Sequence, residues 1–159
     1  FDLARFYAGK DEFESIFATG SNLYDKRFTK IKDFELASCV LKTKKGIQCI
    51  ITNSRHCSFG YDQRVELFGT KGMLISDNKR ETETKIYSGN STNNKPKLLN
   101  FFIERYSEAY KLQLNDLFKM CGKKFKPLAS FEDGRKSLAL AQKAMESIKS
   151  KKFEKIKLI

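Results

Sequence analysis

Histidine is almost absent from this sequence, and so are the short motifs that bind metals and nucleotides. His56 is the single histidine among 159 residues, and the four cysteines form no C-x-x-C pair. Zinc requires a tight ligand cluster, so no metal site is predicted. A catalytic triad would need His56 as its base, and a lone histidine at a strand end is more often structural. Without a G-x-G-x-x-G or Walker motif, no cofactor-binding residue and no catalytic residue is predicted in this chain.

Long hydrophobic runs are also missing. No apolar stretch approaches the roughly 20 residues of a membrane-spanning helix, so no membrane segment is predicted. The sequence starts at Phe1 and has no signal-peptide pattern. Cys39 and Cys49 lie in apolar, strand-like runs, which predicts small buried thiols in a reducing compartment. We expect a cytoplasmic piece of a longer polypeptide.

The charge balance is strongly positive, with a formal net charge of +12. Such an excess raises the question of nucleic-acid binding. The lysines are scattered, however, and acidic residues lie among most of them. No zinc-finger spacing or aromatic RNA-binding signature occurs, so a lysine-rich solvated surface is the preferred interpretation and no nucleic-acid partner is predicted. A basic nucleic-acid-binding domain stays as the last-ranked alternative.

Hydrophobic periodicity places strands first in the chain. Alternation over residues 12–19 predicts a strand with Phe13 and Phe17 on one face and Ile16 and Ala18 on the other. Two loops are predicted, a basic one at 20–31 and a mobile one at 89–97. The remaining predicted strands cover residues 33–43, 46–54, 62–68, 73–76, 81–87 and 153–159, with a turn at Lys44-Lys45-Gly46.

Helical spacing marks three further segments. Residues 2–8 form a short helix with Gly9 as its C-cap, and residues 101–121 form a long helix. Another helix begins at Ser130, where Asp133 three residues later completes a capping box. Its predicted apolar stripe is Leu138, Ala141, Met145 and Ile148.

This order predicts an α+β fold, an open and mostly antiparallel β-sheet with helices packed on one face. We expect residues 1–159 to form a single domain. The strands are rich in phenylalanine, which makes a solvated second face unfavourable. A partner subunit is therefore expected to cover the open sheet face in a homo-oligomer.

Polar side chains gather between residues 53 and 74, where two strands are joined through Gly60. Polar groups on loops held by a rigid sheet often grip a small polar ligand. A solvated strand connection is the alternative, and the pattern alone leaves both open.

Several motifs in this chain resemble the inositol dehydrogenases of the glucose–fructose oxidoreductase (Gfo/Idh/MocA) family, in their C-terminal part. The resemblance runs from Phe1 to about residue 152. Its most specific element is Gly-Tyr-Asp-Gln-Arg followed by a strand and a Gly-x-x-Gly turn. The matching motifs are Phe1-Asp-Leu-Ala-Arg-Phe6, Ala18-Thr-Gly-Ser-Asn-Leu23, Asn53-Ser-Arg55, Gly60-Tyr-Asp-Gln-Arg-Val-Glu-Leu-Phe-Gly69, Lys71-Gly-Met-Leu74, Phe101-Phe-Ile-Glu-Arg-Tyr-Ser-Glu-Ala-Tyr110 and Glu132-Asp-Gly134.

The resemblance implies a parent enzyme that oxidises an inositol or a related polyol or sugar by hydride transfer to NAD. It also implies an N-terminal Rossmann domain that binds NAD and is missing from this chain, together with the family's catalytic lysine, aspartate and histidine. This chain alone is then expected to be inactive and to provide substrate binding and oligomerisation. A non-catalytic assembly module of the same fold is the runner-up.

The same resemblance suggests substrate-binding residues. Tyr61 matches a tyrosine that reaches toward the polyol, and Tyr110 matches one on the long helix near the same pocket. Arg55 and Arg105 are weaker candidates. Phe59 stands where some relatives have tyrosine. Tyr110 also lies on an apolar stripe, so core packing is an equal alternative for it.

Overall fold

The computed structural model describes residues 1–122 and 125–157. They fall into two compact units: unit 1 contains residues up to His56 and those from Pro127 onward, and unit 2 runs from Cys57 to Lys126. Each unit has strands and helices of its own.

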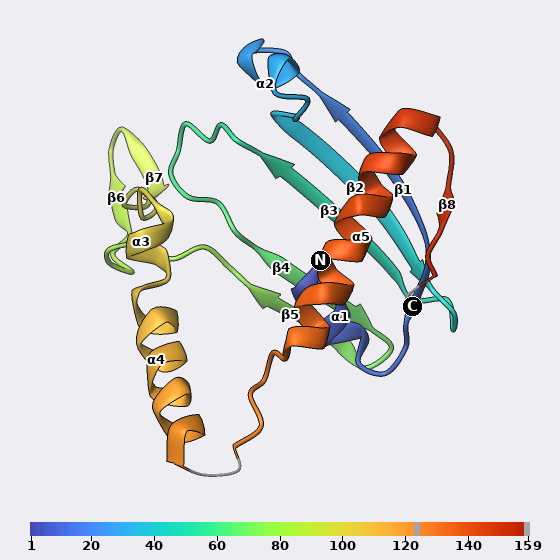
Figure 1. Cartoon of the computed structure of the whole chain (residues 1–159). Helices are drawn as coiled ribbons and strands as arrows, with labels where there is room; N and C mark the ends of the chain where they lie inside the picture. Colours follow the sequence, from blue (N-terminus) through green and yellow to red (C-terminus); the bar gives the residue numbers. More distant parts are fainter. Residues whose placement is uncertain (123–124, 158–159) are drawn as a thin grey trace. The chain divides into compact units, whose positions relative to one another are not determined.

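Unit 1 is built on a four-stranded antiparallel sheet in the order β3–β2–β1–β8 (Figure 1). The predicted hairpin is confirmed: the backbone N–H of Thr43 donates to the Ile47 carbonyl at 2.9 Å, and Gly46 takes a φ of +97° at the turn. The predicted final strand is short, and its last residues, 158 and 159, lie outside the described residues. The strands are β1 (Phe13–Ser21), β2 (Leu36–Thr43), β3 (Gln48–Ser54) and β8 (Glu154–Lys155).

The face of β1 that meets the core differs from the predicted one. Phe13 is buried together with Ile16 and Ala18, whereas Phe17 lies on the opposite face. The prediction had paired Phe13 with Phe17. A β-bulge between Phe13 and Ser15 is the physical reason, because one extra residue shifts the alternation on the bulged strand.

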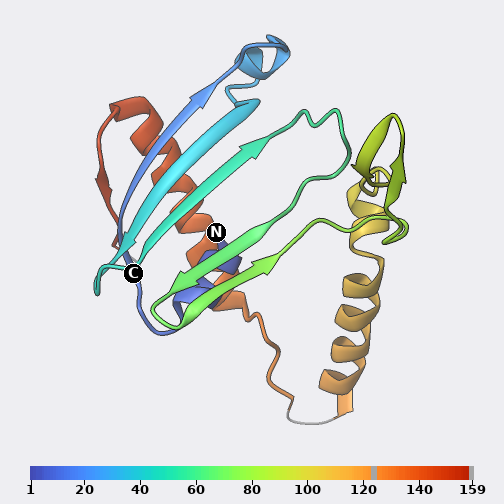
Figure 2. The same ribbon diagram turned by 180° about the vertical axis from the view of Figure 1, so that it is seen from behind.

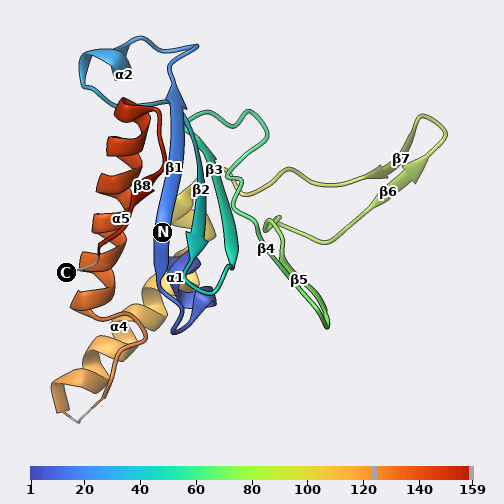
Figure 3. The same ribbon diagram turned by 90° about the vertical axis from the view of Figure 1, so that its right-hand side faces the viewer.

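The helix α5 (Phe131–Ser150) packs across one face of this sheet (Figures 1 and 3). The predicted capping box is confirmed, since Ser130 and Asp133 each bond the other's backbone N–H. The predicted stripe is partly wrong: Leu138 is 59% exposed, and the buried side chains are instead Leu140, Ala144 and Ser147.

Two short helices complete unit 1. The predicted first helix is confirmed as α1 (Asp2–Ala8), with Gly9 at φ +66° as its C-cap, and its Phe1, Ala4 and Ala8 pack against the core. The predicted loop at 20–31 was wrong in part, because β1 extends into it and it contains α2 (Arg27–Lys30).

The opposite face of the sheet carries an apolar row. The strand register aligns Phe17, Val40 and Ile50, and the Phe153 ring lies 5.3 Å from that of Phe17. Ile50 is 72% and Phe153 is 63% exposed. Seen from behind (Figure 2), β1, β2 and β3 lie in front of α5, so no helix described in unit 1 covers this row.

Unit 2 contains two hairpins and two helices, and three predictions need correction there. The strands predicted at 62–68 and 73–76 form a two-stranded sheet of their own instead of continuing a larger one. The region predicted as a mobile loop pairs with the preceding strand, which is shorter than predicted. The long helix is interrupted at Tyr106. The elements are β4 (Val65–Gly69), β5 (Gly72–Ser76), β6 (Ile86–Ser88), β7 (Ser91–Asn94), α3 (Phe102–Arg105) and α4 (Ser107–Gly122).

The predicted class, an α+β fold with open antiparallel sheets and helices, is confirmed. Cys39 is buried, as predicted, whereas Cys49 is only half-buried; burial raises the pKa of both thiols. None of the helices in the described part of the chain is long and apolar enough to cross a membrane.

Candidate functional site

The loop that carries Tyr61 is held by a close backbone approach at Gly60. Gly60 has a φ of +114°, and a Cβ atom there would lie 2.7 Å from the Leu98 Cβ and 3.0 Å from the Leu99 carbonyl oxygen. Only glycine fits this conformation and spacing. The contact lets the backbone N–H of Tyr61 donate to the Leu99 carbonyl at 2.8 Å, which fixes the residue at its Cα.

Each of the three residues after Tyr61 is held by hydrogen bonds. The carboxylate of Asp62 accepts two hydrogen bonds from Arg64, at 2.8 and 2.9 Å, and a third from the Asn78 amide at 2.6 Å. These donors lower the pKa of Asp62, Arg64 first. Asn78 also accepts from the backbone N–H of Gln63 at 2.7 Å. The segment 61–64 is therefore a fixed platform.

Three tyrosines meet beside this platform. The ring of Tyr61 lies edge-on to that of Tyr106, with centroids 5.7 Å apart, and Tyr106 lies edge-on to Tyr110 at 6.5 Å. The Tyr106 hydroxyl donates to Oε1 of Gln63. The guanidinium of Arg105 lies 5.7 Å from the Tyr106 ring centroid, and its Nε is buried without a hydrogen-bond partner in the described part of the structure. Unit 2 thus gathers phenol and guanidinium groups, which suit a ligand rich in hydroxyls.

Burial, followed by the neighbouring Tyr61 side chain, raises the pKa of Tyr106 to about 12. Its hydroxyl therefore keeps its proton throughout the neutral range. The group remains a hydrogen-bond donor toward Gln63 at neutral and moderately alkaline pH.

Arg55 has partners of its own in unit 1. Its guanidinium pairs with the Asp33 carboxylate, donates through Nε to the Phe34 carbonyl at 3.1 Å and lies 4.8 Å from the Phe28 ring centroid. These contacts hold the β1–β2 connection, so the partners found for Arg55 all lie within unit 1.

A buried carboxylate holds the same connection. Glu35 accepts from the backbone N–H groups of Tyr24 at 2.8 Å and Asp25 at 2.6 Å, and Nε2 of His56 lies 3.2 Å from its Oε1. Burial tends to raise the pKa of Glu35, but the backbone N–H groups and His56 outweigh it and leave the pKa below its usual value. The single histidine therefore contacts a group that organises the loop.

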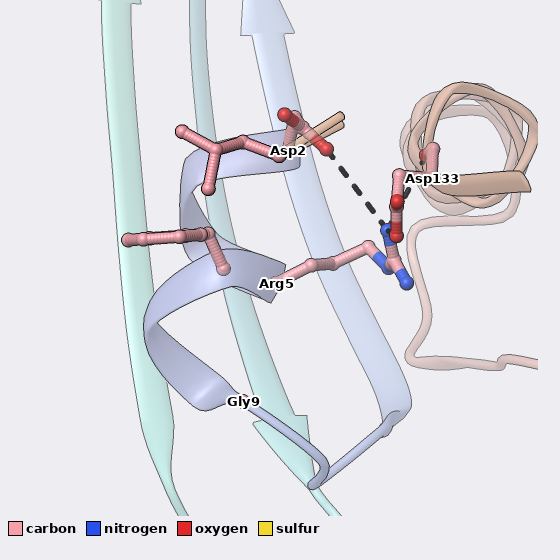
Figure 4. Close-up of a pocket in the computed structure, with 6 residues that line it drawn as sticks. Asp2, Arg5, Gly9 and Asp133 are labelled. Carbon is pink, nitrogen blue, oxygen red and sulfur yellow. Dashed lines mark hydrogen bonds and ion pairs between the residues drawn. The ribbon is translucent and has the colours of Figure 1, made fainter. Parts of the chain in front are cut away.

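A small cavity of about 200 Å³ lies beside α1 and the start of α5 (Figure 4). Arg5, whose side chain is 12% exposed, points toward α5 and donates through Nη1 to Oδ1 of Asp133 at 3.2 Å; Oδ1 of Asp2 lies 4.0 Å from the same nitrogen. Hydrogen bonds from Ser130 first, and then Arg5, lower the pKa of Asp133 to about 2. Arg5 pairs with both carboxylates, while its Nε is buried without a hydrogen-bond partner among the described residues. We assign these ion pairs to joining α1 and α5.

The described residues contain no group of three or more His, Cys, Asp or Glu side chains placed to hold a metal ion. The glycines with positive φ, at positions 9, 46, 60 and 72, lie after a helix, in hairpin turns or in the loop before Tyr61. None of these four forms the strand-to-helix turn that binds a dinucleotide phosphate.

This chain is similar to known proteins along nearly its whole length. The family model of the GFO/IDH/MocA C-terminal domain matches residues 1–75. The myo-inositol 2-dehydrogenase of Thermotoga maritima is 38% identical over 156 residues, which are 98% of this chain and 46% of that protein. The chain belongs to the GFO/IDH/MocA family. It spans about half the length of the curated relatives it matches.

Solved structures of this family share the fold. The myo-inositol dehydrogenase of Corynebacterium glutamicum superposes with a TM-score of 0.90 at 36% identity, over 98% of this chain and 46% of that one. The myo-inositol dehydrogenase of Lactobacillus casei, solved with NAD(H) and myo-inositol, superposes with a TM-score of 0.78 at 20% identity, over 98% and 45%. The second likeness concerns the fold alone.

In this GFO/IDH/MocA domain, three of the four residues singled out from the sequence meet: Tyr61, Tyr110 and Arg105 all surround Tyr106. The sequence reasoning did not select Tyr106, and it placed Gln63 only among the polar groups of the loop. Tyr106 precedes Tyr110 by one helical turn, a spacing that was available as a signal. The contact with Gln63 spans 43 residues and leaves no local pattern.

Proposed function

We propose that this chain is the substrate-binding and oligomerisation domain of an NAD-dependent inositol 2-dehydrogenase that works in the cytoplasm. The observation that carries the proposal is the cluster of Tyr61, Tyr110 and Arg105 on an anchored loop and helix, in a chain 38% identical to a myo-inositol 2-dehydrogenase. The substrate is myo-inositol or a related polyol or sugar.

The tyrosine cluster supplies the chemistry of binding. Phenol hydroxyls both donate and accept hydrogen bonds, which matches the ring hydroxyls of a polyol. Because a polyol that lacks one hydroxyl would leave a half-buried partner unpaired, such contacts discriminate between stereoisomers. We assign Tyr61 and Tyr110 to ring hydroxyls and Arg105 to the rim of the site. Arg55 stays a weaker proposal, because Asp33 and Phe34 already engage its guanidinium.

Bound NAD would accept hydride from the polyol carbon, a step that this chain's residues assist only by holding the ring in place. NAD is assigned to an N-terminal Rossmann domain outside this chain, together with the catalytic lysine, aspartate and histidine. The support is that the described residues offer no dinucleotide-binding turn, while the curated relatives are about twice as long.

The test is NADH formation from myo-inositol, followed by absorbance, in two proteins. One is this chain alone, and the other carries the chain together with its preceding half. We expect activity only in the longer protein. Activity in the chain alone would contradict the assignment of the catalytic groups, and an inactive longer protein would favour a non-catalytic assembly module.

The apolar row Phe17, Val40, Ile50 and Phe153 supports a homo-oligomer in which a second copy covers the open sheet face. An isoleucine that is 72% exposed on the edge strand β3 gains from burial against the same row of another subunit. Light scattering after size exclusion should show an oligomer for the wild type and a smaller species for Ile50→Lys. Thr52→Lys, two residues further along β3 on the same face and outside the apolar row, is the matched control. A wild-type monomer would refute the oligomer.

A further inference from the structure

We infer that Tyr106 is a positioning residue of the proposed polyol site, which sets the place of Tyr61 through its ring and its hydrogen bond to Gln63. This inference rests on the proposed function. In this proposal Tyr106 does not contact the substrate itself. It acts through Tyr61, which does.

Tyr106 is a rigid joint between two helices. It is the C-cap of α3, and its backbone N–H donates to the Phe102 carbonyl at 2.8 Å. Its carbonyl accepts from the backbone N–H of Tyr110 at 3.0 Å, within the start of α4. With both backbone groups bonded, the side chain leaves the helices from a fixed point.

From this point the side chain reaches the platform that carries Tyr61. The hydroxyl of Tyr106 donates to Gln63, whose own backbone N–H is held by Asn78 at 2.7 Å. The ring of Tyr106 meets that of Tyr61 at an interplanar angle of 82°. The backbone N–H of Tyr61 is already hydrogen-bonded to the Leu99 carbonyl. The remaining freedom of Tyr61 is rotation of its side chain, and the Tyr106 ring restricts that rotation.

The hydrogen bond between Tyr106 and Gln63 is insensitive to pH in the working range. With its pKa at about 12, the Tyr106 hydroxyl is protonated at neutral and moderately alkaline pH. A site that reads several hydroxyls of one ring depends on the placement of each partner, because a small misplacement weakens all the contacts together. Losing this joint should therefore reduce affinity and selectivity more than turnover.

The experiment uses the longer, NAD-binding protein and compares Tyr106→Phe with wild type. The change removes the hydroxyl and keeps the ring. We expect KM for myo-inositol to rise about 5- to 10-fold, with kcat changed less than about twofold, equally at pH 7 and pH 9. Tyr87→Phe makes the same chemical change on the exposed strand β6 and should leave both constants unchanged.

A second variant separates positioning from general stability. Gln63→Ala keeps Tyr106 and should raise KM to a similar extent. The double variant should be no worse than either single one, because both remove the same hydrogen bond. Ultraviolet titration gives a readout independent of turnover: the most alkaline tyrosine ionisation should vanish in Tyr106→Phe and persist in Tyr87→Phe.

Failure of the proposed function and failure of the positioning role give different results. A wild-type protein that forms no NADH from any polyol refutes the proposed function. A wild-type protein that does so, with KM unchanged in both Tyr106→Phe and Gln63→Ala, refutes the positioning role alone. Fully additive effects in the double variant would also refute it, since two independent structural defects add.

Discussion

Ser147 is a buried hydroxyl that joins α5 to the edge of the sheet, and its removal should destabilise unit 1. Its Oγ accepts from the backbone N–H of Ala18 at 2.9 Å and donates to the Lys152 carbonyl at 2.6 Å. Because β8 has only two residues, Ala18 lies beyond the end of its pairing with β1. The Ser147 hydroxyl therefore accepts the backbone hydrogen bond of Ala18 that a longer β8 would have accepted.

The cost of Ser147→Ala follows from these contacts. A buried donor left without a partner costs about 1–3 kcal/mol. Alanine recovers roughly 0.5 kcal/mol through its higher helix propensity. We expect the free energy of unfolding to fall by about 2 kcal/mol, measured by urea denaturation followed by circular dichroism.

Ser137→Ala provides the matched control, because it makes the same change on the same helix. Its hydroxyl reaches only an exposed carboxylate, Asp2, at 3.2 Å. We expect a change within about 0.5 kcal/mol. Equal effects at Ser137 and Ser147, or a Ser147→Ala protein as stable as wild type, would refute the assignment of a bridging role to this hydroxyl.

Three further predictions concern the same unit. Leu140→Ala, at a fully buried position, should lower the free energy of unfolding by about 2–5 kcal/mol in the same urea assay. Asp133→Asn should destabilise the protein at neutral pH, and the difference from wild type should disappear as pH falls from about 4 to about 2, because the lowered pKa of Asp133 contributes stability only while the group is ionised. Glu35→Gln should make the β1–β2 connection more susceptible to limited proteolysis, since an amide cannot accept at both positions; an unchanged digestion pattern would contradict this.

The features that could be predicted from the sequence are those that local chemistry determines. The Ser130–Asp133 capping box, the Gly9 C-cap and the turn at Gly46 each depend on residues within a few positions of one another. The bulge near Ser15 does not, because it depends on how β1 pairs with β2. The strand β7 also escaped prediction, since its residues are Ser, Thr and Asn and show no apolar alternation.

The same distinction between local motifs and distant contacts applies to the residues of the candidate site. Tyr61, Tyr110 and Arg105 stand in motifs shared with a family, so the sequence could mark them. Tyr106 depends on a contact across 43 residues with Gln63, and only the folded arrangement reveals it. The polar partners of Arg55, Asp33 and Phe34, lie 22 and 21 residues earlier, and no local pattern pairs them with it.

The most direct test is the KM for myo-inositol of Tyr61→Phe in the longer protein that is proposed to bind NAD. Because this change removes one hydroxyl proposed to contact the ring, KM should rise about tenfold while the protein keeps its melting temperature and oligomeric state. A Tyr61→Phe protein with the wild-type KM would contradict the claim that this domain forms the wall of the polyol site.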